Sequence, residues 1–238
     1  MESGEKRNHD ISIVMPCLDE EKTVGICVDE AWEFIKKNHL SGEVIVVDNG
    51  SKDDSAAVAK AHGALVRKES VKGYGRAIRT GIESSCGNVI MIGDCDTTYD
   101  FLHLEEFYEM LSSGGYDMVI GDRLCGRMQK GAMPLSHKWG VRFLSACARI
   151  RCKTDVRDFH CGLRGLTGEA AVRLPFQTEG MEFATEMILL AAKEGLRIGQ
   201  VPVVLKRCQF ERCSKLHTIR DGFRHLGYIF FGYSNTKK

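Results

Sequence analysis

The chain has 238 residues, with 33 lysines and arginines against 32 aspartates and glutamates, so its formal net charge is +1. Hydrophobic residues make up 43% and charged residues 27%, a globular mixture that excludes a disordered or low-complexity chain. The near-neutral balance argues against bulk nucleic-acid binding, which needs a broad basic field. Residues 206–238, however, hold eight basic and two acidic residues, which predicts an anionic partner near the C-terminus.

The first half of the sequence predicts strands that alternate with helices, an order typical of an α/β domain with a mostly parallel sheet and helices on both faces. Strands are expected at residues 11–15, 43–47, 64–67, 88–92 and 117–120, and helices at 23–37, 54–62, 76–84 and 102–112. The second half is less regular, with a loop at 123–133, a loop and short strand within 155–166, a strand at 196–205, and helices at 134–151, 183–194 and 215–233.

One domain is expected over residues 11–214, after a disordered N-terminus at 1–10 and before a C-terminal amphipathic helix at 215–238. Residues 1–10 are polar and lack the apolar core of a signal peptide. None of the ten cysteines has C-x-x-C spacing, which favours reduced thiols in a cytoplasmic protein over a zinc site. No run approaches the roughly 18–20 apolar residues of a membrane span.

Four polar clusters follow the predicted strands, where ligands bind in open α/β sheets. We expect them to form one site, although a single polar loop after a strand is routine. The clusters are residues 16–20, 48–53, 72–76 and 94–96.

Asp94 and Asp96 follow an apolar strand at alternate positions, which can aim both carboxylates at one point. Two adjacent anions repel unless a cation lies between them. Hard oxygen ligands together with phosphate oxygens suit Mg²⁺ or Mn²⁺, so either ion is the expected cofactor. The alternative is a solvated turn.

The segment Lys72–Arg76 has two glycines but does not fit a dinucleotide loop. That fingerprint follows the first strand and needs a third glycine, so NAD binding is rejected. Backbone amides at a helix start, flanked by two basic side chains, suit a phosphate. A simple helix-entry turn is an equally good reading of this segment alone.

The ordered motifs resemble family 2 glycosyltransferases. These motifs are Ile-Val-Met-Pro-Cys-Leu-Asp-Glu-Glu, Val-Ile-Val-Val-Asp-Asn-Gly-Ser-Lys-Asp, Lys-Gly-Tyr-Gly-Arg-Ala and Gly-Asp-Cys-Asp. Later motifs resemble the polyprenyl-phosphate (dolichyl- or undecaprenyl-phosphate) branch; they lie at residues 97–101, 121–123, 158–164, 180–187 and 220–226. The resemblance covers residues 11–233 and implies the GT-A fold, Rossmann-like, and a nucleotide-diphosphate sugar donor.

The resemblance also implies a role for individual residues. Nucleotide-sugar contacts are expected from Pro16, Asp19, Glu20, Asp48, Lys72, Gly73, Asp94, Arg164 and Glu182. The metal is expected at Asp96 and Asp94, and an acceptor phosphate at Arg123, Arg127 and Lys215. Asp158 and Arg123 are the candidate catalytic residues. For Glu182, and for Glu186 on the same helix face, the alternative is a solvated acidic face.

Two departures from the family pattern matter. Residue 122 is Asp where the family usually has a small residue, which adds a negative charge beside Arg123. Many relatives continue into transmembrane helices near the position where this sequence stops. We therefore expect either a peripheral protein at the cytoplasmic membrane face, working alone or with a membrane-protein partner, or a hydrophobic extension absent from this sequence.

The implied reaction transfers a hexose from a nucleotide-diphosphate sugar to a polyprenyl phosphate with inversion. UDP-glucose is favoured, with GDP-mannose and N-acetylhexosamine donors left open. Asp158 would serve as general base for a hydroxyl acceptor, or would position a phosphate while Arg123, Arg127 and Lys130 steer it. The alternatives are a soluble family 2 enzyme acting on a saccharide, small molecule or polypeptide, a nucleotidyltransferase, and an interaction subunit with a decayed site.

The C-terminal helix has apolar residues at helical spacing, flanked by basic ones. The stripe comprises Leu216, Ile219, Phe223, Leu226, Ile229, Phe230 and Tyr233, and the flanks comprise Lys215, Arg220 and Arg224. A basic amphipathic helix with aromatic residues can lie on an anionic membrane. Packing of the same stripe on the body of the protein is the equally weighted alternative.

Overall fold

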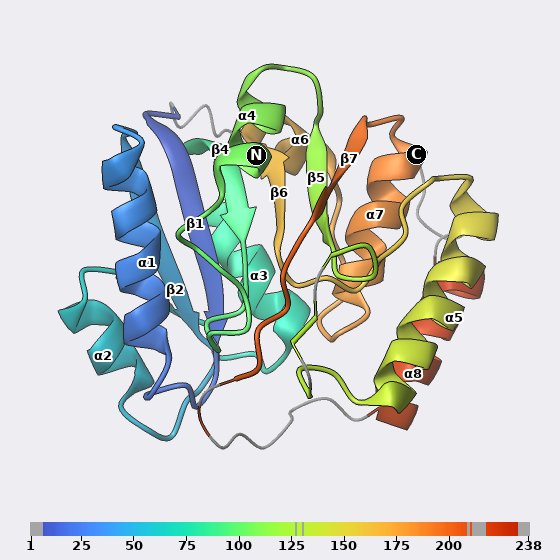
Figure 1. The fold of residues 1–238 in the computed structure, drawn as a ribbon, viewed down its shortest axis with the longest axis horizontal. Coiled ribbons are helices and arrows are strands. Elements are labelled where there is room, and N and C mark those ends of the chain that lie inside the picture. The colour runs from blue at the N-terminus through green and yellow to red at the C-terminus, as the bar shows by residue number, and fades with distance from the viewer. Residues whose placement is uncertain (1–6, 127, 130, 209, 211–217, 233–238) are drawn as a thin grey trace.

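The computed structural model describes residues 7–126, 128–129, 131–208, 210 and 218–232 and is shown in Figure 1. Within these residues one sheet of seven strands has the order β3-β2-β1-β4-β6-β5-β7. The strands are β1 (His9–Cys17), β2 (Gly42–Asp48), β3 (Leu65–Lys68), β4 (Gly87–Ile92), β5 (Met118–Asp122), β6 (Arg164–Thr167) and β7 (Ile198–Pro202). Three of the six strand pairs, β3-β2, β2-β1 and β6-β5, join strands that are consecutive in the sequence, and β4 lies at the centre of the sheet.

Helices cover both faces of this sheet (Figure 1). They are α1 (Val24–Lys37), α2 (Ser55–Ala61), α3 (Tyr74–Glu83), α4 (Glu105–Ser112), α5 (Leu135–Cys152), α6 (Gly168–Arg173), α7 (Phe183–Lys193) and α8 (Thr218–Gly227), and α8 continues into a π-helical turn, η1 (Tyr228–Gly232). Of the helices in these residues, none combines the length and the apolar run needed to cross a bilayer.

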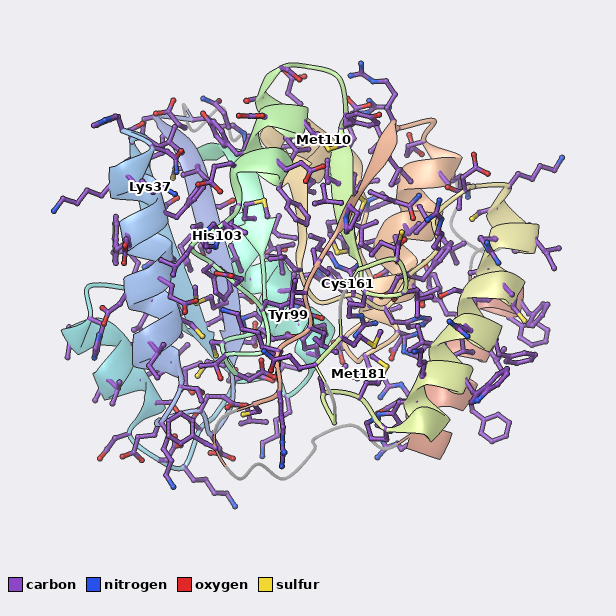
Figure 2. The ribbon with its side chains drawn as sticks, in the orientation of Figure 1. Lys37, Tyr99, His103, Met110, Cys161 and Met181 are labelled. Carbon is purple, nitrogen blue, oxygen red and sulfur yellow. The ribbon has the colours of Figure 1, made fainter. Side chains whose placement is uncertain are left out.

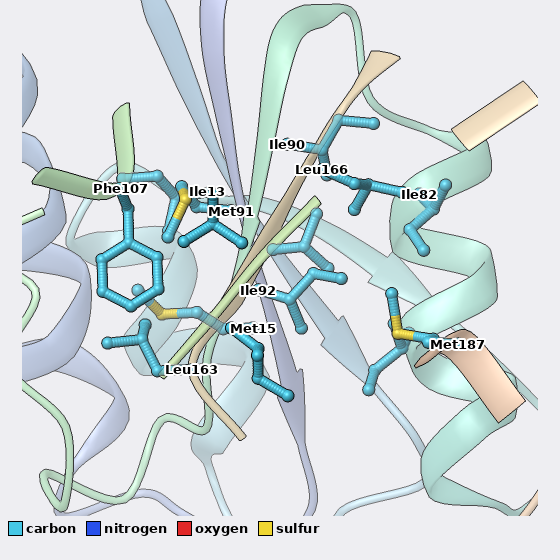
Figure 3. Packing of buried hydrophobic residues seen from close by; sticks show 14 of the residues in the cluster. Ile13, Met15, Ile82, Ile90, Met91, Ile92, Phe107, Leu163, Leu166 and Met187 are labelled. Atoms are coloured by element: carbon cyan, nitrogen blue, oxygen red, sulfur yellow. The ribbon is translucent and has the colours of Figure 1, made fainter. Parts of the chain in front are cut away.

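The core has two layers because the strands in the middle of the sheet bury side chains on both faces. In Figure 3, Met91 of β4 lies on the side of Phe107 from α4. The adjacent Ile90 lies on the opposite side, toward Ile82 of α3 and Met187 of α7. Continuous apolar runs such as those of β1 and β4 are typical of strands buried on both faces. The expectation of a mostly parallel sheet covered by helices is therefore confirmed.

The structure differs from the sequence-based expectation in a few elements. β6 runs antiparallel to both neighbours, β4 and β5, in an otherwise parallel sheet. β1 begins at His9, inside the stretch expected to be disordered, because the backbone amides of Asn8 and His9 donate to Cys86 O. The short helix α6 was not expected. The boundary expected at residue 215 lies outside the described residues.

Candidate active site

The carboxyl ends of β1, β2 and β4 open onto one cavity of about 2040 Å³. It is lined at the end of β1 by Pro16 and Cys17 and just after it by Leu18 and Glu20. Further lining comes from Asn49 after β2, from Lys72, Gly73 and Tyr74 before and in α3, and from Asp94, Cys95 and Asp96 after β4. Tyr99 and Met181, also in the lining, lie in the lower half of Figure 2. The four polar clusters found in the sequence thus meet in one place.

Two hydroxyl groups orient the aspartates of the Asp-Cys-Asp segment. Tyr74 Oη donates to Asp94 Oδ1 over 3.0 Å. Burial raises the pKa of the Tyr74 phenol well above its ordinary value, so it stays protonated and able to donate. The Thr98 hydroxyl and backbone amide both donate to Asp96 Oδ1, the amide over 3.0 Å. The two carboxylates therefore have defined orientations in the wall of the cavity.

The two aspartates fit a divalent cation that is shared with a substrate. The described residues contain no group of three or more His, Cys, Asp and Glu side chains arranged to hold a metal by themselves. Mg²⁺ is commonly held by one or two carboxylates together with substrate phosphates and water. Gly162 makes room for the Asp94 carboxylate, because a Cβ at residue 162 would collide with Asp94 Oδ2. Asp94 and Asp96 can therefore supply the protein part of such a site.

Asn49 holds the Lys72-Gly73 segment against the end of β2. Its Oδ1 accepts from the Gly73 amide over 2.7 Å, and its Nδ2 donates to Val71 O over 2.8 Å. Gly73 has a φ of +156°, and a Cβ there would collide with the carbonyl of Glu179. Only glycine suits this position. Sequence reasoning had not singled out Asn49, although its place directly after β2 was a usable signal.

Asp19 and Asp48 join two loops beside the cavity and are not part of its lining. Asp19 Oδ1 accepts from the Lys52 amide over 2.7 Å, and the Asp19 amide donates to Ser51 Oγ over 3.0 Å. Asp48 Oδ1 accepts from the Ser51 amide over 3.0 Å. Both carboxylates thus shape the loops that follow β1 and β2. Their predicted nucleotide contacts remain predictions.

Arg123 and Asp158 form a buried, two-pronged ion pair. Arg123 Nε lies 2.6 Å from Asp158 Oδ2, and Nη2 lies 2.9 Å from Oδ1. The carboxylate is fully buried and lies outside the cavity lining, whereas Arg123 belongs to it. Bidentate pairs of this kind fix geometry as well as charge. Asp158 therefore lies behind Arg123 and sets the direction of its guanidinium group.

A second ion pair lies directly beside the first. Arg157 Nη1 lies 3.7 Å from Asp122 Oδ2, and Asp122 Oδ1 accepts from the amides of Leu124 and Cys125 over 2.9 Å each. The extra negative charge at residue 122 is thus partnered by Arg157. The two ion pairs, Arg123 with Asp158 and Arg157 with Asp122, connect the end of β5 and the loop after it to the loop before β6.

Arg164 is buried away from the cavity lining. Its guanidinium group donates to the carbonyl oxygens of Ala184, over 2.9 Å, and Cys161, over 3.1 Å from Nε. These contacts join β6 to the start of α7. The expected sugar or phosphate contact of Arg164 therefore has no support in its position.

Glu182 and Glu186 are buried, so the alternative of a solvated acidic face is wrong for both. Glu182 Oε1 accepts from Arg224 of α8 over 2.7 Å. Glu186 accepts from the Gln177 amide over 2.9 Å and from the Tyr228 hydroxyl over 3.2 Å. The two carboxylates anchor the C-terminal helix to α7 and to the segment before it. Glu182 itself does not line the cavity, although Gly180 and Met181 do.

The helix α8 forms one wall of the cavity, from Arg220 to Leu226. His225 Nδ1 lies 2.7 Å from Thr185 Oγ1, and His160 Nε2 lies 3.3 Å from the same oxygen. The two imidazole rings meet edge to face with centroids 4.5 Å apart. Burial lowers the pKa of His225 to about 4 and that of His160 well below its ordinary value, so both are neutral near pH 7.

Sequence reasoning missed both histidines as site residues. His160 belongs to a quoted motif and His225 to the C-terminal one, but neither residue type nor spacing shows that the two rings meet.

The C-terminal stripe is divided between the body and the solvent. Ile229 is buried and Leu226 is half-buried, whereas Phe223 and Phe230 are exposed. Leu216 and Tyr233, together with Arg127, Lys130 and Lys215, lie outside the described residues, and so does the side chain of Ile219. The acceptor-phosphate role of Arg127 and Lys215 remains a prediction.

Comparison with curated proteins gives relatives over most of the chain. The low-salt glycan biosynthesis hexosyltransferase Agl6 of Haloferax volcanii is 34% identical over 220 residues, which is 92% of this chain and 52% of Agl6. The chain thus spans about half the length of that relative. Dolichyl-phosphate beta-glucosyltransferase of Mus musculus is 28% identical, over 81% of this chain and 66% of the mouse protein.

Solved structures give the fold. Glucosyl-3-phosphoglycerate synthase from Mycobacterium tuberculosis, in complex with Mn²⁺ and UDP-glucose, matches with a TM-score of 0.75 and 22% identity. The match covers 97% of this chain and 81% of that one. The expected GT-A fold is thereby confirmed.

A sequence model of the family described as glycosyl transferase family 2 matches residues 12–171, from β1 through β6. This range contains the four loops that line the cavity, both ion pairs at Arg123 and Arg157, and the two oriented aspartates. The chain therefore belongs to glycosyl transferase family 2.

Proposed function

We propose that the protein transfers a hexose from a nucleotide-diphosphate sugar to a polyprenyl phosphate, with inversion at the anomeric carbon. The observation that carries this proposal is the meeting of Asp94, Asp96, Lys72 and Arg123 in one cavity. It places two hard anionic ligands and two basic groups around a space suited to a diphosphate. The names of Agl6 and of the dolichyl-phosphate glucosyltransferase support the reaction class and the acceptor class.

The donor binds at the carboxyl ends of β1, β2 and β4. Asp94 and Asp96 would hold Mg²⁺ or Mn²⁺, and the ion would supply positive charge against the leaving diphosphate. Gly73 lines this part of the cavity with its backbone, and Lys72 supplies a positive charge from the same segment. Pro16, Glu20 and Asn49 bound the region where the nucleoside lies. UDP-glucose is the favoured donor.

The acceptor enters from the side of α5 and α8. The apolar side chains that these two helices contribute to the lining are Val141, Phe143, Leu144, Phe223 and Leu226, beside polar ones such as Arg220 and Arg224. Such a lining suits an isoprenoid chain, because apolar surface is removed from water on binding. Arg123 lines the same cavity and attracts the acceptor phosphate. A lipid acceptor places the working enzyme at the cytoplasmic face of a membrane.

A phosphate acceptor is ionised near neutral pH and needs no strong base to attack the anomeric carbon. Asp158, which lies behind Arg123, therefore acts as a positioning residue for the guanidinium group. Arg123 in turn places the phosphate oxygen in line with the bond that breaks. A positioning role for Asp158, with Arg123 in contact with the substrate, agrees with the fully buried position of the Asp158 carboxylate.

Offering a panel of donors and acceptors tests the proposal. UDP-glucose, GDP-mannose and UDP-N-acetylglucosamine are each mixed with polyprenyl phosphate and Mg²⁺ or Mn²⁺, and the lipid-linked sugar is measured by mass spectrometry. We expect one donor to give a polyprenyl-phosphate hexose with equal release of nucleoside diphosphate. Transfer to a soluble saccharide, small molecule or polypeptide in place of the lipid, or transfer of a nucleotidyl group, would contradict the proposal.

A further inference from the structure

The helix α5 exposes a stripe of large apolar side chains. Trp139 is 70% exposed, Phe143 is 60% exposed and Ile150 is 82% exposed. These positions are four and eleven residues apart, which places them on one face of a helix with 3.6 residues per turn. Water-facing positions of a helix are normally polar. The stripe therefore differs from an ordinary solvated helix face.

The C-terminal elements extend this surface. α5 packs against α8 and η1, and both helices lie at the right-hand edge of Figure 1. Phe223 of α8 is 70% exposed, and in η1 Phe231 is 74% exposed and Phe230 is 52% exposed. Five exposed aromatic side chains and the aliphatic Ile150 are together called the aromatic face: Trp139, Phe143, Ile150, Phe223, Phe230 and Phe231. Exposed apolar clusters of this kind mark interaction sites.

The charge beside the aromatic face has a single sign. α5 carries Lys138, Arg142, Arg149 and Arg151 and has no acidic residue. Arg142 and Arg149 lie seven residues apart, next to the apolar stripe, and line a shallow hollow of about 400 Å³ with Arg157. Arg157 is paired with Asp122, and no ion pair is recorded in the described residues for Arg142 or Arg149. Two guanidinium groups are therefore available to an anionic partner.

The combination of aromatic side chains and basic charge indicates which kind of partner binds the aromatic face. A second copy of the chain would bring two basic helices together, and like charges repel. A neutral apolar partner would leave the arginines without counter-charges. An anionic lipid bilayer satisfies both groups at once, because aromatic rings bury at the interface and basic side chains meet lipid phosphates. We propose that the aromatic face and the α5 arginines dock on an anionic lipid bilayer.

Docking in this way would bring the cavity to the bilayer. Phe143 and Phe223 belong both to the aromatic face and to the cavity lining. The mouth of the cavity on this side would therefore open at the lipid headgroups. Membrane docking of this face rests on the proposed function, because the enzyme would reach a lipid-borne acceptor at a membrane.

Vesicle binding without any donor or acceptor tests this surface separately from transfer. Wild-type protein is sedimented with vesicles of pure phosphatidylcholine and with vesicles that contain phosphatidylglycerol. We expect at least tenfold stronger partitioning to the anionic vesicles, weakened by salt. The variants Trp139→Ala/Phe143→Ala and Arg142→Gln/Arg149→Gln should each lower partitioning at least fivefold. These side chains are on the surface, so the variants should keep the wild-type circular dichroism spectrum.

Matched controls come from exposed residues outside the aromatic face. Arg67→Gln/Lys68→Gln removes two basic groups from β3, the strand at one edge of the sheet, and Leu65→Ala/Val172→Ala removes two exposed apolar side chains. Both controls should partition as the wild type does. Equal loss in a control and in the matching α5 variant would overturn the proposal, and so would equal binding of the wild type to both kinds of vesicle.

Fluorescence gives a second readout that does not depend on sedimentation. The chain has two tryptophans, so Trp32→Phe leaves Trp139 as the only one. Transfer of Trp139 into the interface should shift its emission to shorter wavelength when anionic vesicles are added. An unchanged spectrum, or a shift caused by protein concentration alone in the absence of vesicles, would show that lipid does not occupy this face.

Discussion

At the residue scale, hydroxyl donors hold the aspartates of the cavity, and a carboxylate holds its arginine. Tyr74 donates to Asp94, Thr98 donates to Asp96, and Asp158 accepts from Arg123. A charged group held by fixed partners does not reorganise when a substrate arrives, and such preorganisation is a large part of enzymatic electrostatic stabilisation. The residues behind the lining should therefore matter as much as those in contact with substrate.

Removing one hydroxyl tests the orientation of Asp94. Tyr74→Phe keeps the ring and deletes only the donor to Asp94 Oδ1. Hydrogen bonds to charged groups contribute about 1.5–3 kcal/mol, so we expect roughly a tenfold or larger rise in the KM for donor with a smaller change in kcat. Steady-state kinetics at several Mn²⁺ concentrations measures this. Tyr108→Phe on α4 is the control; an unchanged KM in Tyr74→Phe would contradict the role.

Breaking the buried ion pair tests the place of Asp158. Asp158→Asn leaves the Arg123 charge buried with a weaker partner, and losses of this kind cost about 3–5 kcal/mol. We expect a lower free energy of unfolding, measured by urea denaturation, and a lower kcat with donor and acceptor saturating. Asp122→Asn removes the neighbouring, more exposed pair and should cost less. Full turnover by a folded Asp158→Asn enzyme would show that the pair has no part in the reaction.

At the element scale, three polar contacts join the C-terminal elements α8 and η1 to the body, beside the buried Ile229. Arg224 pairs with Glu182, Tyr228 donates to Glu186, and His225 meets Thr185. The groups that face the two histidines include Glu182, Asp221, Arg164 and Arg224. Because α8 is also a wall of the cavity, its docking and the shape of the active site depend on the same contacts.

Acid should loosen this docking. The folded-state pKa values of His225, about 4, and His160 lie below the unfolded value of about 6.5, so the unfolded chain binds more protons. The stability that depends on the two neutral histidines is then fully present above pH 6.5. As the pH drops from 6.5 toward 4, the free energy of unfolding falls by at most about 1.4 kcal/mol per pH unit for each histidine. Urea denaturation between pH 7.5 and 4.5 measures this.

The matched variant for that titration is His225→Gln, which keeps a polar side chain and removes one proton-binding group. Its stability should fall less steeply between pH 6.5 and 4.5 than that of the wild type. His103→Gln on the surface should leave the slope as it is. Parallel curves for the wild type and His225→Gln would show that the acid sensitivity arises elsewhere.

The sequence was informative where periodicity and strand-end loops determine structure. The strands around β1 and the meeting of Lys72, Asp94 and Asp96 followed from apolar runs that end in polar residues. The antiparallel direction of β6 did not follow, because pairing over a long sequence separation leaves no local pattern. The buried contacts of Arg164 and Glu182 were also hidden, because a charged residue type gives no sign that its partners are carbonyls or a distant arginine.

At the scale of the whole molecule, the cavity joins two chemically different regions. Its donor side lies at the carboxyl ends of the strands and carries Asp94, Asp96 and Lys72. Its other side is lined by α5 and α8, which contribute apolar side chains such as Phe143 and Phe223 together with the charged Arg220 and Arg224. The α5 helix is basic and has no acidic residue. From the basic C-terminal region of the sequence, Arg207, Arg220 and Arg224 line the same cavity.

Calorimetric titration of a nucleoside diphosphate tests the central claim most directly, namely that this cavity is a metal-dependent nucleotide-sugar site. UDP and GDP are titrated into the wild type and into Asp96→Asn, each with Mn²⁺ and with a chelator. We predict that one nucleotide binds the wild type with Mn²⁺, and that the chelator or the substitution weakens binding at least tenfold. Binding that is equal in all four conditions, or no binding of either nucleotide, would contradict the claim.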